Sequence, residues 1–357
     1  MKLIDWYIIK RYLGTFFIMI ILFVPIGIMI DIAEKIDKFK ENEVPFDALI
    51  DYYIDFTWYF SNLLFPIFLF LAVIWFTSKL ANNTEVIAIL SSGISYNRFI
   101  RPFMLSALLI AIITFFMGMF IVPESNKGFN EFLFKHIKKK GERNTNYLFK
   151  QINDDEYIYV SSYNPIRKRA NNFTLEKFNN QQMVSKISAE SIRWISKDSI
   201  FRLTAFNKRD FNGDIEILSK AIYKDTVFDF KIEDLAPVNY KAETLSMFRL
   251  NDFIDKEREN GSILINSHLL TRHKRYSLPL ASFILTLIAV SMSSLKRRGG
   301  MGVNLASGIF LGFLFIFFDK IFGVLVTKSN FSPLLGAWLP LIIFGIISIF
   351  LLKYAKR

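Results

Sequence analysis

The chain has 357 residues, of which 52% are hydrophobic and 16% aromatic, and this composition excludes an ordinary soluble protein. It contains no cysteine, which excludes a disulfide framework, a thiolate metal site and a cysteine nucleophile. The formal net charge of +12 indicates anionic partners, which for a membrane protein are first of all lipid headgroups.

Six apolar segments are long enough to cross a hydrocarbon core of about 30 Å, which takes about 20 helical residues. We expect the spans at roughly 12–30, 57–76, 102–122, 276–295, 301–326 and 334–352. The first span has the basic start of a signal peptide, but its apolar run is too long and no small-residue cleavage site follows. We therefore interpret it as an uncleaved span.

The short flanks of these spans predict the orientation in the membrane. One side receives Lys2, Lys10, Arg11, Lys79, Arg98, Arg101, Lys296, Arg297, Arg298, Lys353, Lys356 and Arg357. The acids on that side are Asp5 and Glu85, whereas the opposite loop at 31–56 carries eight acids against three lysines. We therefore expect a multi-pass protein with both termini and the loop at 78–102 in the cytoplasm.

The loop at 78–102 is predicted to contain a short helix of its own. Asn82 and Glu85 have the spacing of a capping box, and Gly93 is suited to end a helix in the left-handed conformation. The apolar residues that follow at helical spacing are Val86, Ile87, Ile89 and Leu90. We expect a helix at about 83–92, ~15 Å long. Its apolar groups exceed what the loop can bury, so they rest either on lipid or in another protein.

Residues 123–275 lack long apolar runs and instead alternate apolar and polar residues over short stretches. EYIYVSSY, FTLEKF, SIRWI, SIFRLTAF and TVFDFKI predict strands, and NPIRKRANN, NNQQ, KRDFNGD and LAPVN predict turns. Many short strands at this spacing favour an antiparallel sandwich or roll, which the orientation places outside the cytoplasm. A helical connector follows in TLSMFRLNDFIDKERENG, where Gly261 is suited to end the helix.

The predicted architecture is therefore a polytopic α-helical membrane protein of six transmembrane helices with an inserted antiparallel β domain. Residues 1–123 form three spans with the short cytoplasmic helix, 124–275 form the inserted domain with its connector, and 276–357 form three more spans. The sequence contains no P-loop, no H-E-x-x-H and no G-x-S-x-G motif. We expect no catalytic residue, no metal, no cofactor and no nucleic acid partner.

Charged residues beside the spans leave two interpretations open. Lys35, Lys38 and Lys40 are interleaved with acids, so they form either a solvated helix end or a set that meets the phosphates of an anionic amphiphile. Asp319 and Lys320 interrupt the fifth span about 27 Å from its predicted cytoplasmic start. Lys320 either extends its charge to the interface or lines a polar cavity.

Two stretches carry a resemblance to a known family. TEVIAILSSGIS resembles the coupling-helix segment of the LptF/LptG permeases of the lipopolysaccharide transport complex. RHKRYSLPLASFILTLIAVSMSSLKRRGGMGVNLASGIFLGFLFIFF resembles the start of that family's second membrane half, including its R-x-x-x-P-L-A entry and its Arg/Gly-rich turn. The layout of three spans, β domain and three spans is similar over essentially the whole chain.

The resemblance implies a periplasmic β-jellyroll domain and a bacterial inner-membrane location. It also implies four partners: a paralogous LptF/LptG-type subunit, a cytoplasmic LptB-type ATPase dimer, an LptC-type periplasmic bridge protein, and lipopolysaccharide, which would enter between spans one and five. By position, the ATPase-coupling residues would be Glu85, Val86, Ile89, Leu90 and Gly93. The residues expected to meet lipid headgroups are Lys35, Lys38, Lys40 and Lys320.

The predicted function is a permease subunit that extracts lipopolysaccharide from the inner membrane, driven by ATP hydrolysis in a separate chain. A first alternative is a cargo-free protein that transmits movement from a cytoplasmic ATPase to a periplasmic partner. A second is a membrane enzyme that acts on envelope lipids. The sequence leaves open which of the two subunit types this is and whether it pairs with itself.

Overall fold

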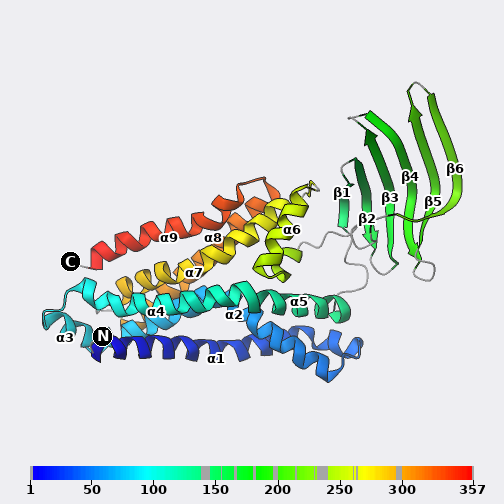
Figure 1. Ribbon diagram of the computed structural model, residues 1–357. Coiled ribbons are helices and arrows are strands. Elements are labelled where there is room, and N and C mark those ends of the chain that lie inside the picture. Colours follow the sequence, from blue (N-terminus) through cyan, green and yellow to red (C-terminus); the bar gives the residue numbers. More distant parts are fainter. Residues whose placement is uncertain are drawn as a thin grey trace. The chain divides into compact units, whose positions relative to one another are not determined.

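The protein is described by a computed structural model that divides into two compact units (Figure 1). The membrane unit comprises Met1–Phe132, Ala242–Leu250 and Asn266–Arg357, and the sheet unit comprises Leu133–Lys241 and Asn251–Ile265. The described residues are 3–137, 145–153, 155–164, 167–179, 182–195, 200–213, 215–228, 230, 240–259, 261–262, 264–294 and 300–355. The predicted basic turn at 296–298, the predicted turn at 235–239, and Lys2, Lys356 and Arg357 lie outside them.

Six helical segments of the described chain are long and apolar enough to cross a membrane. They are α1 (Leu3–Glu41), α2 (Phe46–Asn82), the run Tyr96–Ile137, α7 (Ile265–Ser293), α8 (Gly300–Lys328) and α9 (Pro333–Ala355). The run Tyr96–Ile137 consists of α4 (Tyr96–Phe116), a π-helical turn (Met117–Ile121), α5 (Val122–Phe132) and a second π-helical turn (Leu133–Ile137). Five of the six predicted spans fall within these segments, and the sixth, 276–295, extends two residues beyond the end of α7, so the prediction of six spans is confirmed. Several helices exceed their spans: 39 helical residues in α1 correspond to about 58 Å.

The centre of the membrane unit is α2. In its most apolar window 78% of residues are buried, against 22% in α1 and 17% in α8, and both of these helices pack against α2. Polar side chains inside the bundle pair between helices, as apolar surroundings require. The Tyr12 and Thr286 hydroxyls lie 2.8 Å apart, and the Asn304 amide donates to Ser78 at 3.2 Å. The glycine-rich start of α8 permits close packing, because Gly308 lies directly against Ile74 of α2.

The sheet unit contains one six-stranded antiparallel sheet whose strands lie in chain order. The strands are β1 (Thr145–Asn153), β2 (Glu156–Asn164), β3 (Arg169–Asn179), β4 (Gln182–Ile195), β5 (Ile200–Asn212) and β6 (Ile215–Thr226). The predicted antiparallel β domain is confirmed. The described strands form one up-and-down sheet, however, and not the two facing sheets of a sandwich.

Three details of the predicted strand pattern are wrong. NPIRKRANN was expected to be a turn, but β3 already begins at Arg169. KRDFNGD was expected to be a turn, but β5 continues to Asn212 and the chain reverses at Gly213, which has a φ of +63°. Its charged residues are not turn residues, since they pair along and across the strands; Arg209 lies 3.4 Å from Glu216. TVFDFKI was expected to be a strand, but β6 ends at Thr226, and residues 229, 231 and 232 of this stretch lie outside the described residues.

The apolar residues after β6 have a packing role. Phe228 and Phe230 stack on one another with ring centroids 5.0 Å apart, and both contact Phe173 and Phe201 in the core of the sheet unit. The alternation that predicted a strand therefore comes from a segment that covers the core. β1 was not among the predicted strands, because its polar residues obscure the two-residue alternation of a strand.

The helical connector is present as α6 (Met247–Glu259). Gly261 has a φ of +62°, its N–H bonds the carbonyl of Arg258 at 3.2 Å, and the N–H of Ser262 bonds the carbonyl of Glu257 at 2.9 Å. These two bonds form a Schellman motif, which requires a left-handed residue where glycine stands.

Candidate functional site

The loop between α2 and α4 contains the predicted short helix. This helix, α3, runs from Glu85 to Ser91, slightly shorter than the expected 83–92. Gly93 has a φ of +86° and its N–H bonds the carbonyl of Leu90, so the prediction that it ends the helix is confirmed. We call the end of the membrane unit that carries this helix the α3 end. The opposite end, where α5 ends and α7 begins, is called the insertion end.

The predicted capping box is wrong. Asn82 is the last residue of α2, and the residue before α3 is Thr84, which has a φ of +61° and makes no side-chain cap hydrogen bond. The Glu85 carboxylate instead accepts hydrogen bonds from the Tyr7 hydroxyl of α1 and the Asn83 amide, both at 3.1 Å. The spacing rule failed because α2 continues past its apolar segment and takes Asn82 into its last turn.

The apolar residues of α3 divide into an inner and an outer group. Val86 is only 1% exposed and belongs to the core of the membrane unit, and Ile89 and Leu90 pack partly buried against that core. Ile87 is 52% exposed and points away from the core. Among the predicted coupling residues, Val86 therefore supports α3 from within. Ile87, which was not among them, offers the accessible apolar surface.

The α3 helix rests on a frame of charged and polar contacts between helices. Asp5 of α1 accepts two hydrogen bonds from the Arg98 guanidinium of α4, each at 2.7 Å, in a bidentate ion pair. With the contact from Tyr7 to Glu85, this pair joins the start of α1 to the first residue of α3 and to the first turn of α4. The sequence showed these residues only as charges on one side of the membrane, because nothing in it pairs positions 93 residues apart.

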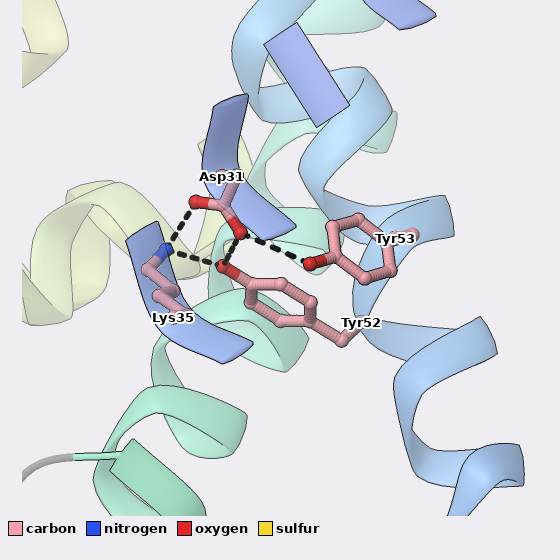
Figure 2. A network of polar contacts seen from close by, with 4 residues as sticks. All are labelled: Asp31, Lys35, Tyr52 and Tyr53. Carbon is pink, nitrogen blue, oxygen red and sulfur yellow. Dashed lines mark hydrogen bonds and ion pairs between the residues drawn. The ribbon is translucent and has the colours of Figure 1, made fainter. Parts of the chain in front are cut away.

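A buried polar network lies near the insertion end of α1 and joins it to α2 (Figure 2). The Asp31 carboxylate is buried and forms an ion pair with Lys35 one turn later. It also accepts hydrogen bonds from the Tyr52 hydroxyl at 3.0 Å and the Tyr53 hydroxyl at 3.3 Å. The Lys35 ammonium donates to the Tyr52 hydroxyl at 2.7 Å and lies 5.8 Å from the ring centre of Phe129. Each charge in the network therefore has partners.

The three lysines predicted to meet lipid headgroups consequently differ from one another. The Lys35 side chain is 16% exposed and held by Asp31 and Tyr52, whereas Lys38 and Lys40 are exposed. Lys40 borders a groove of about 770 Å³ between the ends of α1 and α2, whose other walls are mostly apolar. The solvated-helix interpretation fits Lys38 and Lys40 in this structure, and the buried network was not foreseen for Lys35.

A cavity of about 350 Å³ lies among α2, α5, α7, α8 and α9 near the insertion end. Its charged lining residues are Glu243, Lys274, Arg275, Asp319 and Lys320. The Lys274 ammonium pairs with the Asp319 carboxylate at 2.7 Å. The Arg275 guanidinium donates to the carbonyls of Ala242 at 3.2 Å and Leu245 at 2.5 Å, and so fixes the segment that leads into α6. Lys320 thus lines a polar cavity, the second of the two interpretations made from the sequence.

A groove of about 620 Å³ separates α1 from α8 in the half of the bundle next to α3. Its floor is α2, through Leu71, Trp75 and Phe76, and its sides include Ile18 and Leu22 of α1 and Leu305 and Ile309 of α8. Arg11, Lys79 and Glu85 line the end nearest to α3. The groove therefore has an apolar body and a charged mouth at the α3 end.

The described chain has six candidate spans and an inserted antiparallel sheet. It also has a short helix between the second and third spans and a groove between the first and fifth spans. Residues 6–354 match the family model described as Lipopolysaccharide export system permease LptF/LptG. The chain belongs to the LptF/LptG family. In this family the chain is the permease subunit of an ABC transporter, and the ATPase is a separate protein, LptB.

Two curated relatives of the LptF/LptG family are similar to this chain. They are the lipopolysaccharide export system permease proteins LptG of Escherichia coli strain K12 and of Escherichia coli O6:H1 strain CFT073. Each is 21% identical over 294 residues, which cover 82% of this chain and 81% of the relative. The family predicted from the two sequence stretches is therefore confirmed, and with it the function of a lipopolysaccharide export permease.

Sequence reasoning missed several residues that the structure brings together in this LptF/LptG chain. Asp31 was visible as an acid one turn before Lys35, but the tyrosines that complete the network come from another helix. Arg275 was visible as the arginine of R-x-x-x-P-L-A, which gave a position and no contact. Its carbonyl partners lie 30 and 33 residues earlier in the chain, beyond any local pattern.

Proposed function

We propose that this permease withdraws lipopolysaccharide from the outer leaflet of the bacterial inner membrane while a partner ATPase hydrolyses ATP. The observation that carries the proposal is the groove between α1 and α8, the two spans with the least buried apolar windows. Two membrane helices that both lie on α2 and leave an apolar space between them offer a lateral route for a lipid. In the proposed orientation the α3 end is cytoplasmic and the insertion end is periplasmic. The groove then lies in the cytoplasmic half of the bundle and supports a gap between α1 and α8, whereas the headgroup of an outer-leaflet lipid is proposed to lie at the insertion end, beside Lys38 and Lys40.

The ATPase partner is proposed to be an LptB-type dimer that receives α3. Ile87 supplies an exposed apolar contact and Glu85 supplies an acid at the start of the helix. The contacts of α3 support this role. It is hydrogen-bonded to α1 and packed against α2 and α4, so a displacement of α3 by the ATPase is transmitted directly to these spans. Val86 and Gly93 are proposed to act indirectly, by seating and ending α3.

The headgroup contacts of the proposal are Lys38 and Lys40, whose ammonium groups are exposed and free to meet phosphates. Lys35 is proposed to join them only when it leaves Asp31. A paralogous LptF/LptG-type subunit is proposed to complete the route from the other side. An LptC-type bridge protein is proposed to extend the sheet, since β6 is exposed along most of its length and edge strands accept further strands.

The proposal is tested by capturing the cargo in the groove. A photoreactive amino acid replaces Leu22, which lines the groove, and in a matched control it replaces Ile346 of α9, which is 65% exposed. The assembled complex is placed in vesicles that contain lipopolysaccharide and is irradiated with and without ATP. We expect capture at Leu22 to exceed capture at Ile346. Equal capture at both positions, together with intact ATPase activity, would support the cargo-free alternative.

A further inference from the structure

The cavity near the insertion end contains two charges that lack a direct partner. In the part of the chain that the structure describes, neither the Glu243 carboxylate nor the Lys320 ammonium makes a hydrogen bond or an ion pair. Both residues are exposed and line the same cavity, and the charge of Lys320 acts electrostatically on Glu243. Lys274 and Asp319, which also line the cavity, neutralise one another at 2.7 Å.

A third polar group in the cavity wall is also incompletely satisfied. Arg275 is 9% exposed, and its Nη2 donates to two backbone carbonyls, but its Nη1 has no hydrogen-bond partner. An unpaired donor on a buried guanidinium is costly, and such a group marks a place where a ligand or water completes the bonding. The cavity thus has unmet capacity for both an anion and a cation.

The surroundings of Glu243 change the pKa of its carboxyl. Burial raises the pKa of its carboxyl, while Lys320, Lys274 and Arg275 lower the pKa without cancelling that effect. Glu243 is exposed, because the cavity that it lines is open to solvent. A ligand cation beside it would restore the stabilisation that the carboxylate lacks.

The remaining walls are apolar. They include Leu63, Leu278, Phe315, Ile316 and Leu341, which come from four different helices. Together with the charged residues they form a space that is polar in one part and apolar in another. This is the division that an amphiphile needs, with its headgroup beside the charges and its acyl chains beside the side chains of the spans.

We propose that this cavity binds a headgroup that carries both a phosphate and a primary ammonium, as in a phosphoethanolamine lipid. Lys320 and the Nη1 of Arg275 serve the phosphate, and Glu243 accepts hydrogen bonds from the ammonium. A purely anionic headgroup meets repulsion from Glu243, and a purely cationic one meets three basic side chains. A zwitterion satisfies both signs at once. The site is separate from the groove between α1 and α8 and does not depend on the exported cargo.

The test uses the purified full-length chain in detergent and short-chain lipids that differ only in the headgroup. Dihexanoyl phosphatidylethanolamine has both charges, the phosphatidylglycerol analogue lacks the amine, and the phosphatidylcholine analogue has a cation without N–H donors. Binding is measured by titration calorimetry. We expect the ethanolamine lipid to bind about tenfold more tightly than either analogue, because one charge-assisted hydrogen bond in a partly enclosed site contributes about 1.4 kcal/mol.

Paired variants assign the effect to the two unpartnered charges. Glu243→Gln should reduce the preference for the ethanolamine lipid to about twofold or less, and Lys320→Gln should weaken all three lipids. The matched controls are Glu131→Gln on α5 and Lys328→Gln at the end of α8, both exposed residues that do not line the cavity. These controls should bind like the unmodified chain.

A competition arm separates a lipid from a soluble source of the same chemistry. If free phosphoethanolamine displaces the lipid at equal concentration, the headgroup alone fills the cavity and the ligand is soluble; weak displacement identifies a lipid. Equal binding of all three lipids to the unmodified chain would overturn the proposal and leave a water-filled cavity. A preference that survives in Glu243→Gln would overturn it as well. Neither result bears on capture of lipopolysaccharide at Leu22.

Discussion

Asp31 and Glu243 are two acids near the insertion end of the membrane unit, and their surroundings differ in opposite ways. Asp31 has three donors from two helices around it and is closed to solvent. Glu243 has charges of both signs around it but none in direct contact within the described residues. A satisfied buried acid joins helices, whereas an unsatisfied one beside a cavity keeps its bonding capacity for something else.

The α3 end follows the first pattern. Asp5 and Glu85 each receive hydrogen bonds from a neighbouring helix, so the frame around α3 is tied together by contacts of its own chain. Substitutions of these acids and of the lysines near them test whether the acids divide into structural and receptive ones.

The largest effect is expected for Asp31→Ala. This change leaves the Lys35 ammonium in a site where it is 16% exposed without its counter-ion, and it also removes the acceptor for two tyrosine hydroxyls. Breaking a buried pair by removing one partner costs about 3 kcal/mol. Thermal unfolding of the purified chain in detergent measures the loss. Glu34→Ala, an exposed acid on the same helix, is the control and should unfold like the unmodified chain.

The next effect is expected at Glu85, in two steps. Glu85→Lys should abolish copurification of the partner ATPase, because like charges at an interface repel strongly. Glu85→Gln keeps the hydrogen bond from Tyr7 possible and removes only the charge, so it should weaken copurification modestly. Both variants should still insert into the membrane. If Glu85→Lys retains the ATPase fully, Glu85 faces no basic partner and its role is confined to the frame of α3.

A smaller effect is expected for Lys38→Gln combined with Lys40→Gln. These exposed side chains contribute little to stability, so the unfolding temperature should stay unchanged. Stimulation of the ATPase by lipopolysaccharide in the assembled complex should fall by about half or more, while the basal rate stays the same. Unchanged stimulation would return both lysines to the solvated end of α1.

The smallest effect is a pH dependence at Glu243. The raised pKa of Glu243 means that its carboxyl takes up a proton at a higher pH than an ordinary glutamate, whose pKa is about 4.3. The preference for the ethanolamine lipid should be present above that raised pKa and disappear as the pH falls through it. For folding the sign is opposite, since a raised carboxyl pKa lowers stability as the pH rises. Lipid titrations at several pH values, with Glu243→Gln as the reference, measure the binding trend, and thermal unfolding at the same pH values measures the stability trend.

The sequence predicted the spans well because membrane insertion depends on local sums of hydropathy, and each segment carries its own sum. It predicted the strands less well, since an alternation of apolar and polar residues shows that one side of a segment is buried and does not show that its backbone is a strand. Phe228 and Phe230 alternate as a strand would, yet they cover the core next to Phe173 and Phe201. The polar run at Lys208–Asp210 resembled a turn, yet it continues β5.

The candidate sites were less predictable for a different reason. The position of α3 and the glycine that ends it followed from local spacing, whereas the sequence left two interpretations of Lys320 open. The partners of Lys35, Glu85 and Arg275 could not follow, because each comes from a distant part of the chain. The capping box failed where two local rules competed: α2 had enough helix-favouring residues to extend through Asn82, and this removed the cap.

Thr84 gives the connection between α2 and α3 a mechanical property. A β-branched residue at a φ of +61° adopts a conformation that costs about 1 kcal/mol or more, and it has few other backbone states to visit. A glycine there would turn freely and act as a hinge. With threonine, the joint between the two helices is stiff, so a displacement applied to α3 moves the end of α2 with it and is not absorbed in the turn.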